Sequence, residues 1–439
     1  MKNRTILFIS ALIICSGLLR SAVIMAQATE EPPSHTFANT PPEIYPFFNF
    51  MEPNLRWFEE RHPYLGAARE YPFPENPDVV KIGFIAPLDG SSAYYSLNGQ
   101  QMLNGTLLAF EQANREGGYN GIPFEVIARN DIGLWGASGS ELVTLDDMGV
   151  LAAIGSIDGN NSHVAIRVAL KLELPMVNTG STDPTLTDTR IPWVIRTNQD
   201  DRQFNFALLN EVYNMRGYNR VALLRANNRY ARVGTREFVD GARRLGKPLV
   251  IRQVYLPGET DFAPYLEKIA EADAEAVLLW GEVNEIAEII RQMREAGMSQ
   301  TVFTSDKAVS DYFLQLAGGY AEGVVAAFPY HPHSGNPELE RFYENYRERF
   351  GAEPGSFAVQ AYDGAQILID AIRRAGLNRA LVRDEITSLE TYYGITGEIR
   401  LDGSWNNSTP AFIAEIRNGE FYFRQYEWHS ASQAETATP

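Results

Sequence analysis

The stretch Leu174–Leu186 carries the side chains best suited to binding chemistry in this sequence. It begins as a short apolar strand and ends in small or hydroxyl-bearing residues, with Gly180 followed by Ser181 and Thr182. A glycine lets a ligand approach the backbone because no Cβ blocks it. The Asp-Pro step at Asp183 suits the start of a helix, whose free N–H groups can hold a carboxylate. Taken alone, the stretch fits either such an anion site or a strand–helix junction that Asp183 simply caps.

Signatures of catalysis are absent from the sequence. It contains no Walker loop, dinucleotide-binding glycine fingerprint, nucleophile elbow or zinc-peptidase helix. His331 and His333 form the only close histidine pair, and the proline between them indicates a loop rather than a metal site. Paired catalytic carboxylates leave no signature in an acidic chain, so the sequence alone does not exclude a glycosidase. We expect no catalytic residues, no metal and no cofactor.

The N-terminus has the order of a secretory signal. Lys2 and Arg4 precede an apolar run that is short for a membrane span, and Ala26-Gln27-Ala28 forms a small-x-small cleavage site. Cys15 lies inside the run without a small residue before it, so lipid attachment is not expected. We expect residues 1–28 to be a signal peptide and the mature chain to be exported without any cysteine.

Length and charge limit the classes of protein that fit. A chain of 439 residues exceeds what one hydrophobic core usually holds, so two domains are expected. The formal net charge of −17 becomes −20 once residues 1–28 are removed. An acidic surface argues against nucleic acid or anionic membrane as a partner.

Residues 29–78 differ from the rest of the chain because they combine many prolines with many aromatic residues. The prolines interrupt helices and central strands. The aromatic residues are unlike a solvated linker. We expect this extension to pack along the protein's own folded body or against a partner.

From Val79 strand-like and helix-like stretches alternate, and the alternation restarts after Thr197. The expected strands are Val79–Ala86, Phe124–Arg129, Val150–Ile154, Pro175–Asn178, Val221–Leu224, Leu249–Val254, Ala276–Leu279 and Thr301–Thr304. The expected helices are Asn98–Asn114, Leu134–Asp147, Ser162–Leu172, Asp201–Asn214, Val233–Leu245, Asp261–Ala270, Asn284–Ala296, Val309–Leu316, Glu338–Phe350 and Ser356–Arg374. Two such blocks predict an α/β protein with two lobes, each a parallel sheet covered by helices.

The C-terminal part reads as strands. Gly397–Leu401, Ala411–Arg417 and Glu420–Phe423 are strand-like, and Asn418-Gly419 predicts a hairpin between the last two. Ligands of such proteins bind outside the carboxyl ends of the strands, between the lobes.

Several stretches carry a family likeness in the right order. They are Asn104–Gly121, Ala153–Ser156, Leu174–Thr182, Thr260–Ile269 and Ala361–Ala365. Together they resemble the leucine/isoleucine/valine-binding proteins, the type I periplasmic binding proteins of ABC transporters, over roughly residues 79–425.

The resemblance implies a type I periplasmic-binding-protein fold, with two Rossmann-like lobes joined by three hinge crossovers. The N-lobe would comprise residues 79–197 and 329–409, and the C-lobe residues 198–328 and 410–430, followed by a disordered tail at 431–439. The protein would lie in the periplasm as a monomer and close on a small solute by a hinge.

The resemblance also implies site residues. Gly159 and Asn160, with Gly180, Ser181 and Thr182, would hold a ligand α-carboxylate. Asp306 would take the ligand ammonium, and Tyr230 would cover the ligand. Asn98, Trp280 and Glu282 stand at further contact positions.

Several of these positions depart from the pattern of the relatives. Asn98 stands where relatives often have a tyrosine or another contact residue, and Gly159 replaces a serine that binds carboxylate. Asp183 puts a negative charge beside the expected carboxylate loop, and Trp280 precedes Glu282 in a loop that usually presents aromatic residues. A polar amino acid, an amide or urea-like solute, or an aromatic acid is therefore as open as an apolar amino acid.

Two functions follow from these expectations. The first is a solute-binding protein that delivers an amino-acid-like molecule to an ABC permease in the inner membrane. The alternative is a ligand-sensing periplasmic module for amide-like, urea-like or aromatic-acid solutes, which docks a membrane receptor when loaded.

Overall fold

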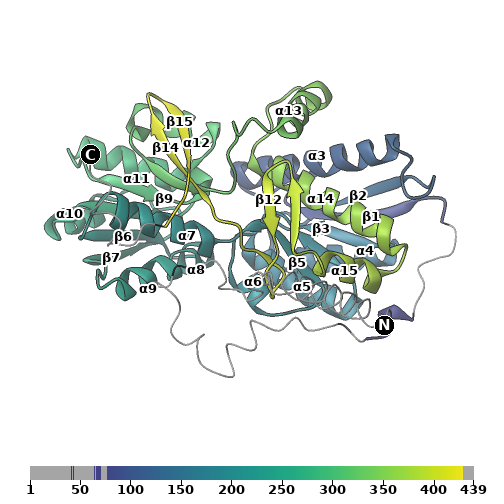
Figure 1. Cartoon of the computed structure of the whole chain (residues 1–439). Coiled ribbons are helices and arrows are strands. Elements are labelled where there is room, and N and C mark those ends of the chain that lie inside the picture. The colour runs from purple at the N-terminus through teal and green to yellow at the C-terminus, as the bar shows by residue number, and fades with distance from the viewer. Residues whose placement is uncertain (1–40, 42, 44–63, 65, 71–76, 429–439) are drawn as a thin grey trace, which may run out of the picture.

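The computed structural model describes residues 41, 43, 64, 66–70 and 77–428. The predicted signal peptide, most of the extension and the tail at 431–439 lie outside these residues. Figure 1 shows two α/β lobes side by side, each built around its own sheet. Within the described residues, no helix is long and apolar enough to cross a membrane.

The first sheet is parallel, in the order β13-β5-β4-β3-β1-β2. Its strands are β1 (Val80–Ala86), β2 (Phe124–Asn130), β3 (Ala152–Gly155), β4 (Met176–Asn178), β5 (Val194–Gln199) and β13 (Asn406–Asn407). Successive residues of β1 face opposite sides, so Phe84 joins one apolar core and Ile85 another. Helices cover both faces, which is why the central strands β1 and β3 are mostly apolar.

Helices cover the sheet of the first lobe. They are α3 (Ala93–Arg115), α4 (Trp135–Asp147), α5 (Gly159–Leu172), α6 (Thr185–Asp188), α13 (Pro337–Phe350), α14 (Ser356–Ala375) and α15 (Arg379–Thr387). The pair α3 and α14 packs together on one face, and α4 and α5 on the other.

The second sheet has the order β15-β14-β10-β9-β8-β6-β7. Its strands are β6 (Val221–Ala226), β7 (Ile251–Tyr255), β8 (Ala276–Trp280), β9 (Thr301–Thr304), β10 (Val325–Phe328), β14 (Phe412–Arg417) and β15 (Glu420–Gln425). Around it lie α7 (Asp201–Leu209), the π-helical η4 (Asn210–Met215), α8 (Arg229–Gly234), α9 (Arg236–Arg244), α10 (Ala263–Glu271), α11 (Val283–Glu295), η5 (Asp306–Ala308), α12 (Asp311–Ala317) and η6 (Gly318–Ala321).

The chain crosses between the two sheets three times. The crossings follow β5, β10 and β13. The predicted fold class is therefore confirmed. The hairpin at Asn418-Gly419 is also confirmed: β14 and β15 are antiparallel, and both turn residues have positive φ, 54° and 77°.

Some elements differ from the sequence-based prediction. The single helix predicted over Val233–Leu245 is wrong, because α8 and α9 are separate helices that meet at Thr235. Gly234, which ends α8, packs so closely on Trp280 that an added Cβ would lie 2.5 Å from the indole nitrogen. The first helix begins at Ala93, earlier than predicted, because Ser92 caps it.

Other elements were missed. The sequence did not indicate β10 or α15, and Gly397–Leu401 does not extend either main sheet. Instead β12 (Gly397–Arg400) pairs with β11 (Thr391–Gly394) in a separate two-stranded sheet.

The described part of the extension packs on the first lobe. The ring of Tyr64 lies 4.6 Å from that of Trp193, centroid to centroid. Ala68, in the short helix η3 (Ala67–Arg69), shares a small apolar cluster with Trp193 and Ala380 of α15. For these residues the expectation of packing along the protein's own body holds.

Candidate solute-binding site

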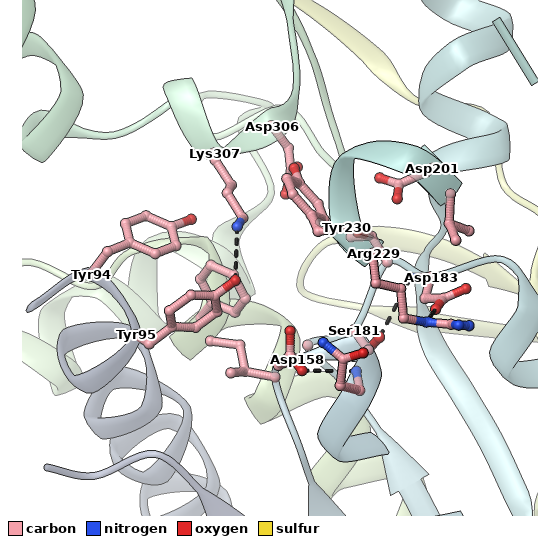
Figure 2. Close-up of a pocket in the computed structure, with 17 residues that line it drawn as sticks. Tyr94, Tyr95, Asp158, Ser181, Asp183, Asp201, Arg229, Tyr230, Asp306 and Lys307 are labelled. Carbon is pink, nitrogen blue, oxygen red and sulfur yellow. Dashed lines mark hydrogen bonds and ion pairs between the residues drawn. The ribbon is translucent and has the colours of Figure 1, made fainter. Parts of the chain in front are cut away.

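A cavity opens between the two lobes, at the carboxyl ends of β3 and β4 on one side and of β6 and β9 on the other (Figure 2). It spans about 500 Å³ with the open solvent at its mouth included. The lining residues are Tyr94, Tyr95, Ile157, Asp158, Gly159, Asn160, Gly180, Ser181, Thr182, Asp183, Asp201, Arg229, Tyr230, Val233, Asp306, Lys307 and Phe357.

Two first-lobe loops are tied together by the fully buried Asn178 at the end of β4. Its side-chain nitrogen donates to the carbonyl oxygens of Gly155 (3.1 Å) and Ser156 (2.9 Å), and its oxygen accepts from the N–H of Ser181 (2.9 Å). One buried amide therefore fixes the loop after β3 against the loop after β4.

The start of α5 is capped within the protein. Oδ1 of Asp158 accepts hydrogen bonds from the N–H groups of Asn160 (2.8 Å) and Asn161 (3.1 Å). Burial raises the pKa of Asp158 above its usual value. This helix start thus brings a carboxylate to the cavity and uses two of its own N–H donors to hold that carboxylate.

Two further carboxylates enter the cavity from the first crossover and the second lobe (Figure 2). Asp201, only 1% exposed, begins α7, and Asp306 begins η5 directly after β9. The Oδ1 atom of each is buried and has no hydrogen-bond partner among the described residues. Burial raises the pKa of Asp306 to about 6. Burial, followed by the charge of Asp306, raises the pKa of Asp201 well above its usual value.

Arg229 of α8 reaches across the cavity to the first lobe. Its Nε donates to Oδ2 of Asp183 (2.9 Å), and its Nη2 donates to the hydroxyl of Thr185 (2.8 Å). Burial alone would raise the pKa of Asp183, but hydrogen bonds from His163 and Thr185 and the charge of Arg229 hold it far below its usual value. Asp183 also accepts from the N–H of Thr185 (2.9 Å) and so caps the turn of α6.

Lys307 lies among aromatic rings at the other end of the cavity. Its Nζ donates to Glu282 (2.9 Å) and to the hydroxyl of Tyr95 (3.0 Å). The same atom lies 3.8 Å from the ring centroid of Tyr230, 4.8 Å from that of Tyr95 and 5.4 Å from that of Tyr94. Burial would lower the pKa of Lys307, but the charge of Glu282 and the surrounding tyrosines hold it above its usual value. Lys307 is therefore a paired cation.

Seven of the predicted site residues line the cavity: Gly159, Asn160, Gly180, Ser181, Thr182, Tyr230 and Asp306. The other three predicted residues do not line the cavity but contact residues that do; they are Asn98, Trp280 and Glu282. Asn98 is buried and donates to the carbonyl of Tyr94 within α3 (2.9 Å). Trp280 packs against Tyr230, and the centroids of the two rings lie 6.1 Å apart. Glu282 caps α11 and holds Lys307.

Some lining residues were missed as site residues from the sequence. Tyr95 lies at the start of α3, close after the first strand, and Lys307 follows Asp306, so both positions were within reach of a motif argument. Asp201 and Arg229 had no local signal, because a crossover and a helix start give them a role only in three dimensions.

Two sheets joined by three crossovers around a polar interlobe cavity define a two-lobed solute-binding protein. Residues 79–420 match the family model of the periplasmic binding proteins. The chain therefore belongs to this non-enzymatic family. The resemblance drawn from the sequence is confirmed.

Similar proteins cover most of the chain at modest identity. Leu/Ile/Val-binding protein homolog 2 of Brucella abortus is 28% identical over 78% of this chain and 91% of its own length. A leucine-binding protein from Thermotoga maritima is 26% identical, with a TM-score of 0.71 over 79% of this chain and 97% of its own. A Rhodopseudomonas palustris protein solved with 3,4-dihydroxybenzoic acid is 20% identical and shares the fold, with a TM-score of 0.69 over 80% and 98% of the two chains.

Proposed function

We propose that this protein captures a small solute bearing an amino group, an amino acid or a close derivative, and delivers it to an ABC permease in the inner membrane. The observation that carries the proposal is the pair of carboxylates of Asp201 and Asp306, each with a buried oxygen that has no partner among the described residues. A buried carboxylate without a partner is costly, whereas one that meets an ammonium is not.

The two carboxylates suit an ammonium because it has three N–H donors and no acceptor. Hydrogen bonds between charged groups contribute about 1.5–3 kcal/mol each. Both carboxylates have raised pKa values because they are buried, and a nearby cation would lower those values. The ammonium of a bound solute would therefore favour the ionised form of both carboxylates.

The remainder of the cavity would hold the body of the solute. Tyr230, Val233 and Phe357 offer apolar surface, and Ser181 and Thr182 offer hydroxyl groups. Relatives whose names specify leucine, isoleucine and valine as ligands support an amino-bearing solute of this size.

We further propose that the N-lobe comprises residues 79–197 and 329–409 and the C-lobe residues 198–328 and 410–430, and that the lobes close by a hinge at the three crossovers. The mature protein would act in the periplasm as a monomer, after removal of residues 1–28. Docking of the loaded protein to a membrane receptor stays a separate prediction of the sequence.

The test is a thermal-shift screen of amino acids, their amides and simple amines, followed by calorimetry on Asp306→Asn. We expect at least one amino-bearing compound to raise Tm, since a ligand stabilises the state it binds. Loss of the Asp306 charge should weaken its binding by roughly 2–5 kcal/mol. The matched control is Asp311→Asn, an exposed aspartate of α12 that should leave affinity unchanged. Equal affinities of the two variants would contradict the proposal.

A further inference from the structure

Asp158 brings to the cavity a carboxylate that the proposed ammonium site does not use. It caps the start of α5 and lines the cavity. Its Oδ1 accepts from the N–H groups of Asn160 (2.8 Å) and Asn161 (3.1 Å), so the backbone of α5 fixes how the carboxylate is turned. Its Oδ2 accepts no hydrogen bond from the described residues, and Figure 2 shows one oxygen of Asp158 pointing into the cavity.

The neighbours of Asp158 differ from those of the ammonium site. Burial raises the pKa of Asp158, and the charge of Lys307 opposes this shift. Burial also raises the pKa of Asp201, but there the charge of Asp306 adds to the shift. Figure 2 accordingly shows Asp158 on the side of Tyr95 and away from Asp201. An ammonium held by Asp201 and Asp306 therefore leaves Asp158 for a second group of the solute.

Lys307, whose charge acts on Asp158, is engaged elsewhere. Its Nζ donates to Glu282 (2.9 Å) and to the hydroxyl of Tyr95 (3.0 Å), and it lies 3.8 Å from the ring centroid of Tyr230. An ammonium has three N–H donors, and these three neighbours account for them. Lys307 thus favours the ionised form of Asp158 without supplying a hydrogen bond to Oδ2.

Apolar side chains line the cavity beside this carboxylate. Ile157 directly precedes Asp158, and the rings of Tyr94 and Phe357 lie 6.5 Å apart, centroid to centroid. Such walls suit the methylene groups of a solute side chain. A wholly apolar side chain, however, would cover Oδ2 of Asp158 and leave it without water or a donor, which is costly.

We propose that the solute is an amino acid whose side chain has an apolar stem and ends in an N–H donor, an ammonium, a guanidinium or an amide, which Oδ2 of Asp158 accepts. This inference rests on the proposed function and narrows its substrate class. Asp201 and Asp306 hold the α-ammonium, and Asp158 selects the side chain. The loop Gly180–Thr182 stays open to the carboxylate of the same solute.

The experiment compares L-ornithine, L-norleucine, L-glutamine and L-glutamate by calorimetry at neutral pH on the full mature protein. Ornithine and norleucine have side chains of equal length and differ in ending in an ammonium or a methyl group. We expect ornithine to bind about tenfold or more tightly than norleucine, because it alone can donate to Asp158. Glutamine should likewise bind more tightly than glutamate, whose side-chain charge would meet that of Asp158.

The variant Asp158→Asn tests the cause. An asparagine keeps an oxygen that can cap α5 but removes the charge that faces the cavity. The preference for ornithine over norleucine should therefore fall by about tenfold, with the affinity for norleucine unchanged. Asp158→Ser, which also caps a helix, should give the same result. Asp147→Asn, at the exposed last residue of α4, changes the net charge equally and should leave the preference unaltered.

The outcomes separate this inference from the function on which it rests. If norleucine binds as tightly as ornithine and glutamine, and Asp306→Asn weakens all three, the inference is overturned and the amino-group site stands. If none of the four amino acids binds, the inference falls, and the wider thermal-shift screen alone decides the proposed function. An equal change in preference for Asp158→Asn and Asp147→Asn would show a general effect of net charge and would also overturn the inference.

Discussion

Asp201 and Asp306 are the two side chains of the cavity on which the proposed binding depends. Both are carboxylates, both have raised pKa values, and both leave an oxygen without a partner among the described residues. Asp183 shows how much the partner matters, because a carboxylate of the same cavity has a lowered pKa once Arg229, His163 and Thr185 hold it. Environment rather than residue type therefore decides which carboxylate is left for a ligand.

Binding of a cation should depend on pH through Asp306. The pKa of Asp306 is about 6, above the ordinary value, so the carboxyl is protonated below pH 6 and must lose that proton when an ammonium binds. Affinity for an amino-bearing solute should fall from pH 7 to pH 5, and Asp306 contributes roughly tenfold per pH unit below its pKa, since it releases one proton. Calorimetry across this range measures the effect. The Asp306→Asn variant should show a shallower dependence, and an unchanged slope would contradict the assignment.

At the scale of elements, close packing fixes where the loops of the site stand. The helices α3 and α14 approach so closely that a Cβ on Gly105 would lie 2.1 Å from the carbonyl oxygen of Ala358. Tyr94 and Tyr95 at the start of α3 and Phe357 at the start of α14 line the cavity. The contact between the two helices thus positions three aromatic residues of the site.

Alanine at two helical glycines should have opposite effects on stability. Gly105→Ala should lower the free energy of unfolding by roughly 1–3 kcal/mol, because the methyl group meets a backbone atom that cannot move away. Gly136→Ala in α4, where nothing lies within 4 Å of the added Cβ, should raise it by about 0.5–1 kcal/mol. Urea denaturation of both variants measures these changes. A neutral Gly105→Ala would mean that the two helices can separate at little cost.

Across the whole molecule, polar bridges join the two lobes over the cavity. Arg229 in the second lobe holds Asp183 in the first, and Lys307 in the second holds the hydroxyl of Tyr95 in the first. These contacts are made by the protein's own side chains. They therefore stabilise the arrangement of the two lobes that the structure shows.

The variant Tyr95→Phe should shift the empty protein toward an open form. It removes the hydroxyl that accepts from Lys307 and keeps the ring that lies near the ammonium. Loss of one such hydrogen bond amounts to about 0.5–1.5 kcal/mol, enough to change the open fraction several-fold. Small-angle X-ray scattering should show a larger radius of gyration for this variant than for Tyr393→Phe, an exposed tyrosine of β11 that serves as the control. Equal radii would exclude a role for Tyr95 in closure.

The sequence by itself determined the alternation of strands and helices, the two blocks, the hairpin at Asn418-Gly419 and the family. These features follow from local patterns: apolar periodicity, turn residues, and ordered motifs that each span a few residues. The loop Gly180–Thr182 could be chosen in advance from its local pattern, and Tyr230 and Asp306 from the resemblance to the family.

Only the tertiary structure decided which charges meet. Asp201 comes to the cavity because the first crossover turns into α7 there, and Glu282 neutralises Lys307 because β8 and β9 are neighbours in the sheet. Likewise, Gly234 at the break between α8 and α9 packs closely on Trp280, which is distant in the sequence. Electrostatic pairing and close packing act through space between distant segments. A linear pattern therefore located the site, while the fold determined which of its charges are left for a solute.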